Sequence, residues 1–537
     1  MEKSFTKFDR VRSSIGFILS PILFISIILL PTPQSFINYI QSNFQHLSPE
    51  EILEVSYSMK IVLALLVMMV TLWITEAIPI PATAILPAVI LPIFKVTGIT
   101  GNEIYHFNGK NVLANYANPI IYLFLSGFLI ARAMQKWNLD KRITYSILNF
   151  RNLAEQPKLI VLALIFISAF LSMWISNTAT TAMLLPLVIG IVSITKSNND
   201  NFQKALSLSI AYGASIGGVA TLIGTPPNGI CVSIMRTSGI GDINFLEWMK
   251  LGLPITLISI PVIWILLTGI FSVNEVKIQN GKNFISNLKE KLGPISKGEK
   301  LTLFSFFILL ILWISNPFWE VILPDNLFNQ LKYFDENIIA LTVALLMFFI
   351  PVDWKNKKFV LDWNDSKFVD WGTLLLFGGG IALSDAMFKT GLAGLIAKTT
   401  INMTGNLSPL LLILVIVIFI DFLTEVTSNT AVTSMMVPIL ISISIGLNID
   451  AKLLALAATF ASSMAFMLPV ATPPNAIVYG SGYLKITDMI KAGFILDILA
   501  WLIITFVLLV FGDLIFQTVN FWFNFLRNYK QIQSSKN

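Results

Sequence analysis

Charged residues are scarce in this chain. Of its 537 residues, 12% are Asp, Glu, Lys or Arg, about half the roughly 25% of an ordinary globular domain. Hydrophobic residues make up 55%, which is more than one soluble core can bury, because such cores stop growing near about 300 residues. This composition excludes a soluble enzyme and a disordered chain, and it favours a polytopic membrane protein. The apolar runs are longer than the roughly 10 residues of a spanning strand, so we expect helices.

Cysteine and histidine are almost absent as well. Cys231 is the single cysteine, which excludes an intrachain disulfide and a thiolate metal cluster. The two histidines, His46 and His106, fall in expected loops, so histidine-based chemistry within the membrane is excluded and no cofactor is expected. The net charge of +6 comes from basic residues in short loops between apolar runs. It therefore indicates membrane orientation and not binding to nucleic acid.

Eleven apolar segments are predicted to cross the membrane. About 20 helical residues, at about 1.5 Å each, cross a hydrocarbon core of about 30 Å. The predicted spans are residues 13–30, 60–78, 80–96, 119–136, 206–235, 251–271, 301–322, 337–352, 371–388, 452–480 and 490–523.

Two further apolar regions are too long for one crossing. As single helices, residues 158–194 and 408–446 would each be about 55–60 Å long. Each contains a polar Ser-Asn-Thr triplet near its middle, at 176–178 and 428–430. We therefore predict two re-entrant helical hairpins, each of which enters and leaves on one side of the membrane.

The distribution of basic residues orients the chain. Segments placed inside hold 23 Lys and Arg, whereas loops placed outside hold 6, without the C-terminal tail. This predicts a cytoplasmic N-terminus and, after eleven crossings, a C-terminus on the periplasmic or extracellular side.

The chain also resembles itself at an offset of about 250 residues. WISNTATTAMLLPL at 174–187 recurs as VTSNTAVTSMMVPI at 426–439, and GTPPN at 224–228 recurs as ATPPN at 471–475. A third block matches Leu139 with Leu392. The first hairpin begins inside and the second outside, so the repeats are inverted. Inverted repeats with interrupted helices are typical of secondary transporters, whose binding site lies where the repeats meet.

Both repeated motifs free polar groups for a ligand. Ser and Thr hydroxyls and the Asn carbonyl are hard oxygen donors that suit a small cation. Pro226 and Pro227 have no N–H, as is true of the prolines of the second motif, so nearby carbonyls lose their helical partners. The new helix start favours an anion. A lone triplet more often packs helices together, but two inverted hairpins, each followed by TPPN, favour a binding site.

Neither motif contains Lys or Arg. A bound anion would then need bound cations as partners, which predicts cation-coupled symport. Asp421 and Glu425, one turn apart before the second triplet, have two interpretations: a proton or cation site, or carboxylates that hold loose backbone amides. An enzyme is not expected, because no HExxH or paired-aspartate motif is present. A channel suits inverted hairpins less well than alternating access does.

In these motifs the chain resembles the divalent anion/sodium symporter family of di- and tricarboxylate transporters, closest in pattern to bacterial sodium/dicarboxylate symporters. FLTEVTSNTAVTSMMVPI at 422–439 and AFMLPVATPPNAIVYGSG at 465–482 carry the resemblance. It implies a homodimer in which a scaffold holds a transport domain that moves like an elevator. The implied scaffold parts are residues 1–157 and 272–407, and the implied transport parts are 158–271 and 408–537.

The resemblance also implies site residues. The first sodium site would use Ser172, Ser176, Asn177 and the backbone at Gly224. The second would use Thr424, Thr427, Asn429 and the backbone at Ala471. The dicarboxylate would be held by Asn177, Thr178, Thr225, Pro226, Ser428, Asn429, Thr430, Thr472 and Pro473.

The function implied by the resemblance is sodium-coupled uptake of a C4-dicarboxylate such as succinate, malate or fumarate across a bacterial cell membrane. Citrate or sulfate transport, and sodium-independent dicarboxylate exchange, remain alternatives. Sodium-independent exchangers of the family tend to depart from the second triplet and to place a basic residue nearby. The intact TSNT sequence at 427–430, with no basic residue between Lys398 and Lys452, makes the resemblance favour symport over exchange.

Overall fold

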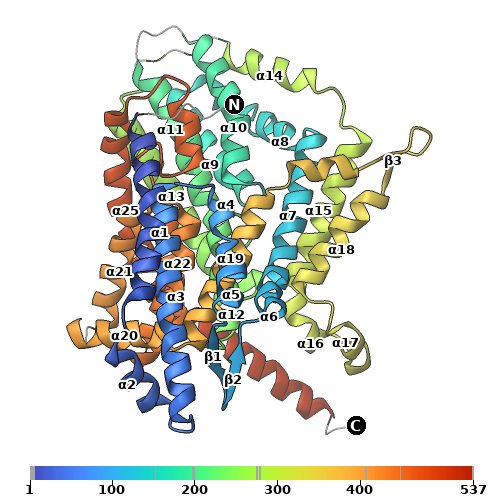
Figure 1. Ribbon diagram of the computed structural model, residues 1–537. Helices are drawn as coiled ribbons and strands as arrows, with labels where there is room; N and C mark the ends of the chain where they lie inside the picture. Colours follow the sequence, from blue (N-terminus) through green and yellow to red (C-terminus); the bar gives the residue numbers. More distant parts are fainter. Residues whose placement is uncertain are drawn as a thin grey trace. The chain divides into compact units, whose positions relative to one another are not determined.

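The computed structural model describes residues 7–534 apart from 151–152, 196–199, 274–275, 277, 279, 405–407 and 448. Helices make up most of this part of the chain (Figure 1). Its strands form two short antiparallel pairs, β1 (Thr97–Thr100) with β2 (Glu103–His106) and β3 (Pro351–Asp353) with β4 (Lys358–Phe359). The predicted all-α membrane fold is confirmed.

Eight stretches of the described residues are long and apolar enough to cross a membrane as helices. They are Arg10–Leu29, Pro49–Thr75, Gly109–Lys136, Phe245–Ile270, Lys297–Ile322, Trp371–Lys389, Asn429–Gly446 and Ile486–Phe511. Other predicted spans consist of shorter apolar helices, such as Ile80–Ile93 and Ala451–Ser462. The expected combination of long spans and interrupted helices is therefore present.

The chain divides into two compact units, each made of three segments. The first unit comprises Met1–Ile121, Gly229–Asp242 and Asp370–Ser462, and the second comprises Tyr122–Asn228, Ile243–Val369 and Ser463–Asn537. The two units are sets of residues that contact one another, whereas the predicted scaffold and transport parts are defined by which part moves. The division into scaffold and transport parts therefore stays a prediction.

The helices of the first unit carry one hairpin and its supporting helices. They are α1 (Lys7–Leu29), α2 (Gln34–Asn43), α3 (Pro49–Thr75), α4 (Ile80–Thr83), α5 (Leu86–Ile93), α6 (Gly109–Ala114), η1 (Asn115–Ala117), most of α12 (Pro226–Thr237), α19 (Trp371–Lys389), α20 (Leu392–Thr404), α21 (Pro409–Thr424), α22 (Asn429–Gly446) and α23 (Ala451–Ser462).

The second unit carries the other hairpin. Its helices are most of α7 (Pro119–Lys136), α8 (Leu139–Leu148), η2 (Leu153–Glu155), α9 (Pro157–Ser172), α10 (Asn177–Ser193), α11 (Asp200–Val219), α13 (Phe245–Ile270), α14 (Gly281–Lys291), α15 (Lys297–Ser315), η3 (Asn316–Phe318), α16 (Trp319–Ile322), α17 (Asp325–Leu331), α18 (Glu336–Phe349), η4 (Trp363–Phe368), α24 (Pro473–Tyr479) and α25 (Ile486–Ser534).

Several long helices start with a capping box, in which the N-cap residue and the third helical residue exchange hydrogen bonds. At α3, the Glu51 N–H donates to Ser48 Oγ at 3.3 Å, and the Ser48 N–H donates to Glu51 Oε2 at 2.7 Å. Asn244 and Ser296 start α13 and α15 in the same way. The starts of these three spans are therefore determined by a few neighbouring residues.

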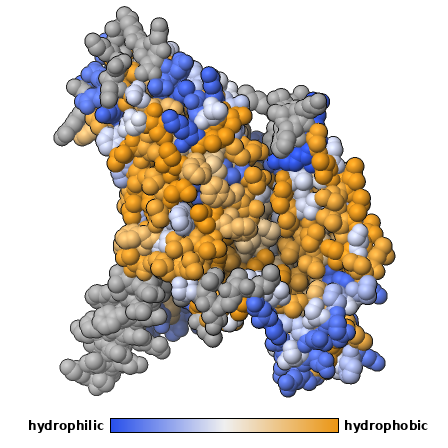
Figure 2. Space-filling model, turned by 90° about the vertical axis from the view of Figure 1, so that its left-hand side faces the viewer, coloured by the Kyte–Doolittle hydropathy of each residue, from blue (hydrophilic) through white to orange (hydrophobic). Residues whose placement is uncertain are grey.

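Hydrophobic side chains gather on the face shown in Figure 2, with hydrophilic residues toward its two ends. On α15, Phe304, Phe307 and Ile311 are each more than half exposed, at 61%, 53% and 63%. Their spacing of three and four residues places them on one side of the helix. Contact with lipid explains why such large apolar side chains lie outside the core.

Both long apolar regions are broken into two helices at their polar triplets. In the second unit, α9 and α10 both pack against α11 (Figure 1). In the first unit, α21 and α22 both pack against α23. The predicted breaks are confirmed, because neither region continues as one helix. The side of the membrane on which each hairpin opens stays a prediction.

Candidate ion- and substrate-binding site

The first hairpin turns between Ser172, the last residue of α9, and Asn177, the first residue of α10. Ser172 Oγ donates to Asn177 Oδ1 at 2.6 Å, and Thr181 Oγ1 donates to the Asn177 carbonyl at 2.9 Å. Ser176 caps α10, since its Oγ accepts from the Ala179 N–H at 3.3 Å. A hydroxyl and an amide oxygen therefore lie together at the start of a helix.

A broken helix lies against this tip within the second unit. After α11 ends at Val219, residues 220–225 are not helical, and Pro226 starts α12. Thr221 Oγ1 donates to the Met173 carbonyl in the hairpin turn at 2.6 Å. This bond joins the loop of the broken helix to the turn of the hairpin.

Two glycines allow the close approach of loop and tip. A Cβ atom on Gly218 would lie 2.5 Å from Asn177 Oδ1, and one on Gly224 would lie 2.5 Å from the Gly218 carbonyl oxygen. Asn177, Gly218 and Gly224 therefore contact one another in series. Sequence reasoning placed Asn177 and Gly224 in the site but missed Gly218 and Thr221. Both lie in the stretch 217–228, where the dense glycines were the available signal.

The second hairpin repeats the same contact in the first unit. Thr424 ends α21, Asn429 starts α22, and Thr424 Oγ1 lies 2.6 Å from Asn429 Oδ1. Thr424 Oγ1 also lies 2.8 Å from the carbonyl of Ser462, the last residue of α23. Thr433 Oγ1 donates to the Asn429 carbonyl at 3.0 Å and lies 2.7 Å from Ser462 Oγ. Sequence reasoning missed Thr433 and Ser462.

The second broken helix continues in the second unit. Residues 463–472 are not helical, and α24 starts at Pro473 with Thr472 as its N-cap. The Asn475 N–H donates to Thr472 Oγ1 at 3.3 Å. In this unit α24 packs against α10 and α11, so the second TPPN motif lies with the first hairpin.

The predicted site residues differ in exposure. Ser172, Thr424, Thr427, Thr430, Thr225, Thr472 and Ala471 are buried, as is Gly224, whereas Ser176, Asn177, Pro226, Ser428 and Asn429 are half-buried. Thr178 and Pro473 are exposed. Thr427 Oγ1 has no hydrogen-bond partner among the described residues, so it is available to a cation. The predicted residues thus mix buried oxygens suited to ions with exposed groups suited to a larger ligand.

Two basic side chains of α7 are paired with acids. Arg132 Nε lies 3.0 Å from Asp365 Oδ1, and Lys136 Nζ lies 2.7 Å from Asp365 Oδ2. Lys136 also contacts Asp362 at 2.9 Å, and this hydrogen bond lowers the pKa of the Asp362 carboxyl. These charges pair with one another, so Arg132 and Lys136 do not offer a free positive charge to an anion.

Among the described residues, no group of three or more His, Cys, Asp or Glu side chains is placed to hold a metal ion. Asp421 and Glu425 are buried, at 1% and 2% exposed, just before the second tip. Both of their interpretations, as a proton site or as a support for the turn, stay open. Neutral hydroxyl, amide and carbonyl oxygens suit a monovalent hard cation better than a transition metal.

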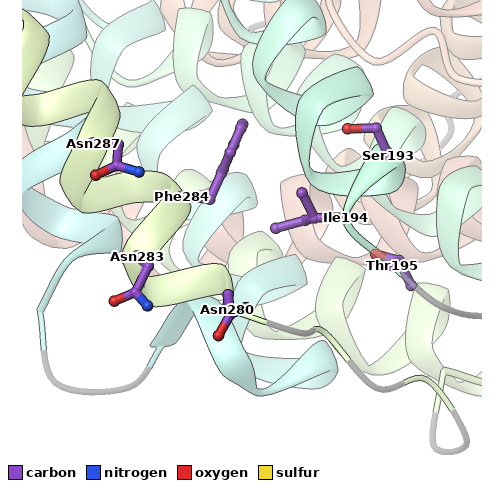
Figure 3. Close-up of a pocket in the computed structure, with 7 residues that line it drawn as sticks. All are labelled: Ser193, Ile194, Thr195, Asn280, Asn283, Phe284 and Asn287. Atoms are coloured by element: carbon purple, nitrogen blue, oxygen red, sulfur yellow. The ribbon is translucent and has the colours of Figure 1, made fainter.

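Two open depressions lie along α10. One, of about 510 Å³, lies between the end of α10 and α14 and is lined by Ser193, Ile194, Thr195, Asn280, Asn283, Phe284 and Asn287 (Figure 3). It is about 24 Å along the helix from Asn177, so it is separate from the tip. The other, of about 640 Å³, includes Ala179, two residues after Asn177, and Lys141 and Tyr145 of α8.

Comparison with known proteins decides the family. A family model described as the sodium:sulfate symporter transmembrane region matches residues 48–518, which contain both hairpins and both proline-interrupted helices. The chain belongs to this family. The membership confirms the resemblance to divalent anion/sodium symporters and the expectation of a transport protein instead of an enzyme.

Curated relatives match this chain over nearly its full length. A protein named sodium-dependent dicarboxylate transporter SdcS from Staphylococcus saprophyticus is 36% identical over 518 residues, which is 94% of this chain and 92% of the relative. SdcS from Staphylococcus aureus strain NCTC 8325 is 34% identical over 508 residues, 92% of this chain and 90% of the relative. Among solved structures, the Alcanivorax borkumensis YdaH transporter covers 83% of this chain and 98% of its own, at 12% identity and a TM-score of 0.48.

Proposed function

We propose that this protein is a sodium-coupled symporter of C4-dicarboxylates such as succinate, malate or fumarate. It would work as a homodimer in a bacterial cell membrane by an elevator mechanism, with its N-terminus in the cytoplasm and its C-terminus outside. The names of the relatives, sodium-dependent dicarboxylate transporters at 34–36% identity, support sodium and dicarboxylate as its ligands.

The observation that carries the proposal is the repeated contact at the two hairpin tips. Ser172 Oγ and Asn177 Oδ1 lie 2.6 Å apart, and Thr424 Oγ1 and Asn429 Oδ1 lie 2.6 Å apart. Each pair collects neutral oxygens beside a helix start. Neutral oxygens favour a hard cation, and a helix start favours an anion, so each tip suits both ligands of a symporter.

Each tip would hold one sodium ion. At the first, the Ser172 and Ser176 hydroxyls, the Asn177 amide oxygen and the Gly224 carbonyl would be ligands. At the second, the ligands would be Thr424, Thr427, Asn429 and the Ala471 carbonyl. The unpartnered hydroxyl of buried Thr427 supports this assignment, because a buried polar atom without a partner is costly unless a ligand contacts it.

The dicarboxylate would bind hydroxyls, amides and helix starts instead of basic side chains. Its proposed ligands are Asn177, Thr178, Thr225, Pro226, Ser428, Asn429, Thr430, Thr472 and Pro473. Since the motifs hold no Lys or Arg, two bound sodium ions would offset the two negative charges. Sodium would therefore bind before or with the substrate, which couples the two fluxes.

The depression beside Ala179 suggests a route for release. It is bounded by α8 and α14, which belong to loops predicted to lie in the cytoplasm, and it reaches the start of α10. A dicarboxylate leaving the first tip on this side would pass Lys141, whose positive charge lowers the cost of moving an anion away from the ions. Release on this side fits net uptake.

Transport assays with purified protein in liposomes test the proposal. Succinate uptake should require a sodium gradient and should fail with potassium or protons alone, and unlabelled malate or fumarate should compete. Asn283→Ala, on the exposed face of α14, is a matched control that should transport as the wild type does.

The same assay distinguishes the alternatives. Sodium-driven uptake of citrate or sulfate, without competition by succinate, would replace the substrate but keep the mechanism. Uptake that needs internal dicarboxylate and no sodium would identify an exchanger. Uptake driven only by protons would assign the coupling role to Asp421 and Glu425 and contradict the sodium sites.

A further inference from the structure

Two buried asparagines, which we call the loop asparagines, hold the broken helices in shape. Asn228 is fully buried, and its Nδ2 donates to the Gly218 carbonyl at 2.9 Å and to the Thr221 carbonyl at 2.8 Å. Asn475 is fully buried too, and its Nδ2 donates to the Ala465 and Leu468 carbonyls, each at 3.1 Å.

The two sets of bonds correspond atom for atom. The three positions correspond at a single offset of 247 residues: Ala465, Leu468 and Asn475 stand where the first repeat has Gly218, Thr221 and Asn228. Of these three positions only the asparagine is identical between the repeats, since glycine is replaced by alanine and threonine by leucine. The conserved feature is therefore the amide donor and its two backbone acceptors, which indicates that the bonds matter more than the side chains they reach.

The break in the helix explains why a side chain donates here. Residues 220–225 are not helical, so the carbonyls at the end of α11, such as that of Gly218, do not continue the helical hydrogen-bond pattern. Pro226 and Pro227 occupy the first two positions of α12 and have no N–H, so they supply no donor. Buried carbonyls require a donor. The loop asparagine supplies it from the third helical position, across the break. Pro473, Pro474 and Asn475 have the same order.

One carbonyl in each loop connects the asparagine to a proposed sodium ligand. The Thr221 carbonyl accepts from Asn228 Nδ2 and also from the Gly224 N–H, at 3.3 Å. The Leu468 carbonyl accepts from Asn475 Nδ2 and from the Ala471 N–H, at 3.2 Å. Each bond therefore sets the turn on which the Gly224 or Ala471 carbonyl is presented.

We propose that Asn228 and Asn475 are positioning residues for the two sodium sites, one for each. Neither needs to touch the ion. Each keeps its loop in the shape that places one backbone ligand, so its loss should weaken sodium binding at that site before it affects the substrate. This inference rests on the proposed function, and it adds that the two sites can be weakened separately.

The test measures thermal unfolding of purified protein as sodium replaces potassium at constant ionic strength, without substrate. Asn228→Leu keeps the branched shape of the side chain and removes both amide donors. The Asn228 Oδ1 atom has no hydrogen-bond partner among the described residues, so no other side-chain hydrogen bond is lost there. We expect the half-effective sodium concentration to rise about 10- to 100-fold, the range for residues that orient metal ligands. Asn228→Ser, which retains one donor, should give a smaller shift and serves if the Leu variant does not fold.

Thr256→Val is the matched control. Thr256 is also buried in the second unit, and its Oγ1 donates to the Ile216 carbonyl of α11 at 2.8 Å, just before the same break. It should lower the unfolding temperature without changing the half-effective sodium concentration. An equal sodium shift in Thr256→Val would show that any loss of stability produces the effect, and would overturn the proposal.

Double variants assign Asn228 to one of the two proposed sodium sites. Asn228→Leu with Ser172→Ala should shift sodium dependence less than the product of the single shifts, since both act on one site. Asn228→Leu with Thr424→Ala should give the full product. The reverse pattern, or a wild-type sodium response in Asn228→Leu, overturns the positioning role alone. A wild-type protein that sodium neither stabilises nor drives would overturn the proposed function with it.

Discussion

The two hairpin tips share one contact but differ in what surrounds it. Both join a hydroxyl to an asparagine oxygen at 2.6 Å, from Ser172 in one repeat and Thr424 in the other. The second tip adds Thr427, Glu425 and Asp421, where the first repeat has Ile175, Met173 and Ala169. Both repeats keep one hydroxyl beside one asparagine oxygen, whereas the added polar groups occur only in the second repeat.

The layer behind the tips differs as well. In the second repeat, Ser462 Oγ lies 2.7 Å from Thr433 Oγ1. Its counterpart in the first repeat, Ser215, is buried with no hydrogen-bond partner for Oγ among the described residues. Ser215 lies in a Gly-x-Ser-x-Gly stretch, but it is in the middle of α11 and not on the exposed turn that a nucleophile requires. The first repeat therefore lacks the serine hydroxyl contact that the second repeat has behind its tip.

The strongest test of equivalence removes the shared atom from each repeat in turn. Asn177→Ala and Asn429→Ala should each lower sodium-driven dicarboxylate uptake at least about 100-fold. Each asparagine is proposed to contact both the cation and the anion, so its removal should have a larger effect than the removal of a residue that only orients a ligand. Sodium and substrate dependence of uptake are the measurements. Normal sodium-driven uptake in Asn429→Ala would contradict the assignment of the second site.

A second difference between the repeats involves charge. Asp140, near the start of α8, is 3% exposed, and burial raises the pKa of its carboxyl to about 6, although the Lys141 N–H donates to it. The corresponding residue after Leu392 is Ala393. A carboxyl with a raised pKa favours the neutral form in the folded state. Ionising the buried Asp140 carboxyl destabilises the folded state. This destabilisation is absent below about pH 4, grows as the pH rises, and reaches its full size above about pH 6.

Asp140→Asn should remove that destabilisation. We expect the variant to exceed the wild type in free energy of unfolding by up to about 3 kcal/mol above pH 7, with the difference vanishing near pH 4. Thermal unfolding across this pH range measures it. Asp353→Asn is a control on an exposed carboxylate whose pKa hydrogen bonds from Asn356 lower, and it should not gain stability as the pH rises. Parallel pH curves for wild type and Asp140→Asn would show that Asp140 is not buried in a neutral form.

The additional hydroxyl at the second tip gives a smaller effect. Thr427→Val keeps the shape and removes the unpartnered oxygen, so sodium affinity should fall about tenfold, equal to about 1.4 kcal/mol. Ile175→Thr would place a hydroxyl at the matching position of the first repeat, and should not lower sodium affinity. Unchanged sodium dependence in Thr427→Val would remove this residue from the proposed ligands.

The smallest expected effect compares the two serines behind the tips. Ser462→Ala should destabilise the protein by about 1–2 kcal/mol, since it leaves Thr433 without one partner. Ser215→Ala should be neutral or slightly stabilising, because it removes a buried hydroxyl that has no partner among the described residues. Unfolding temperatures of the two variants measure the difference, and equal losses would show that Ser215 makes a compensating contact.

The sequence alone determined where the helices break. A polar triplet in a long apolar run, and a Pro-Pro pair without N–H groups, end helices for local reasons, so the breaks at Asn177, Asn429, Pro226 and Pro473 were predictable. The repeat then pointed to the two motifs as a pair, and the resemblance supplied the predicted site residues. It also indicated the family that the comparison confirmed over residues 48–518.

Only the tertiary structure decided which atoms support those breaks. Thr221 reaches Met173 across 48 residues, and Gly218 contacts Asn177, although threonine and glycine occur throughout the chain without such roles. Nothing in the sequence showed whether the loop asparagines donate hydrogen bonds to backbone carbonyls or bind an ion. Packing chose between those roles, because a buried amide donates to whichever backbone carbonyls the fold leaves without a partner.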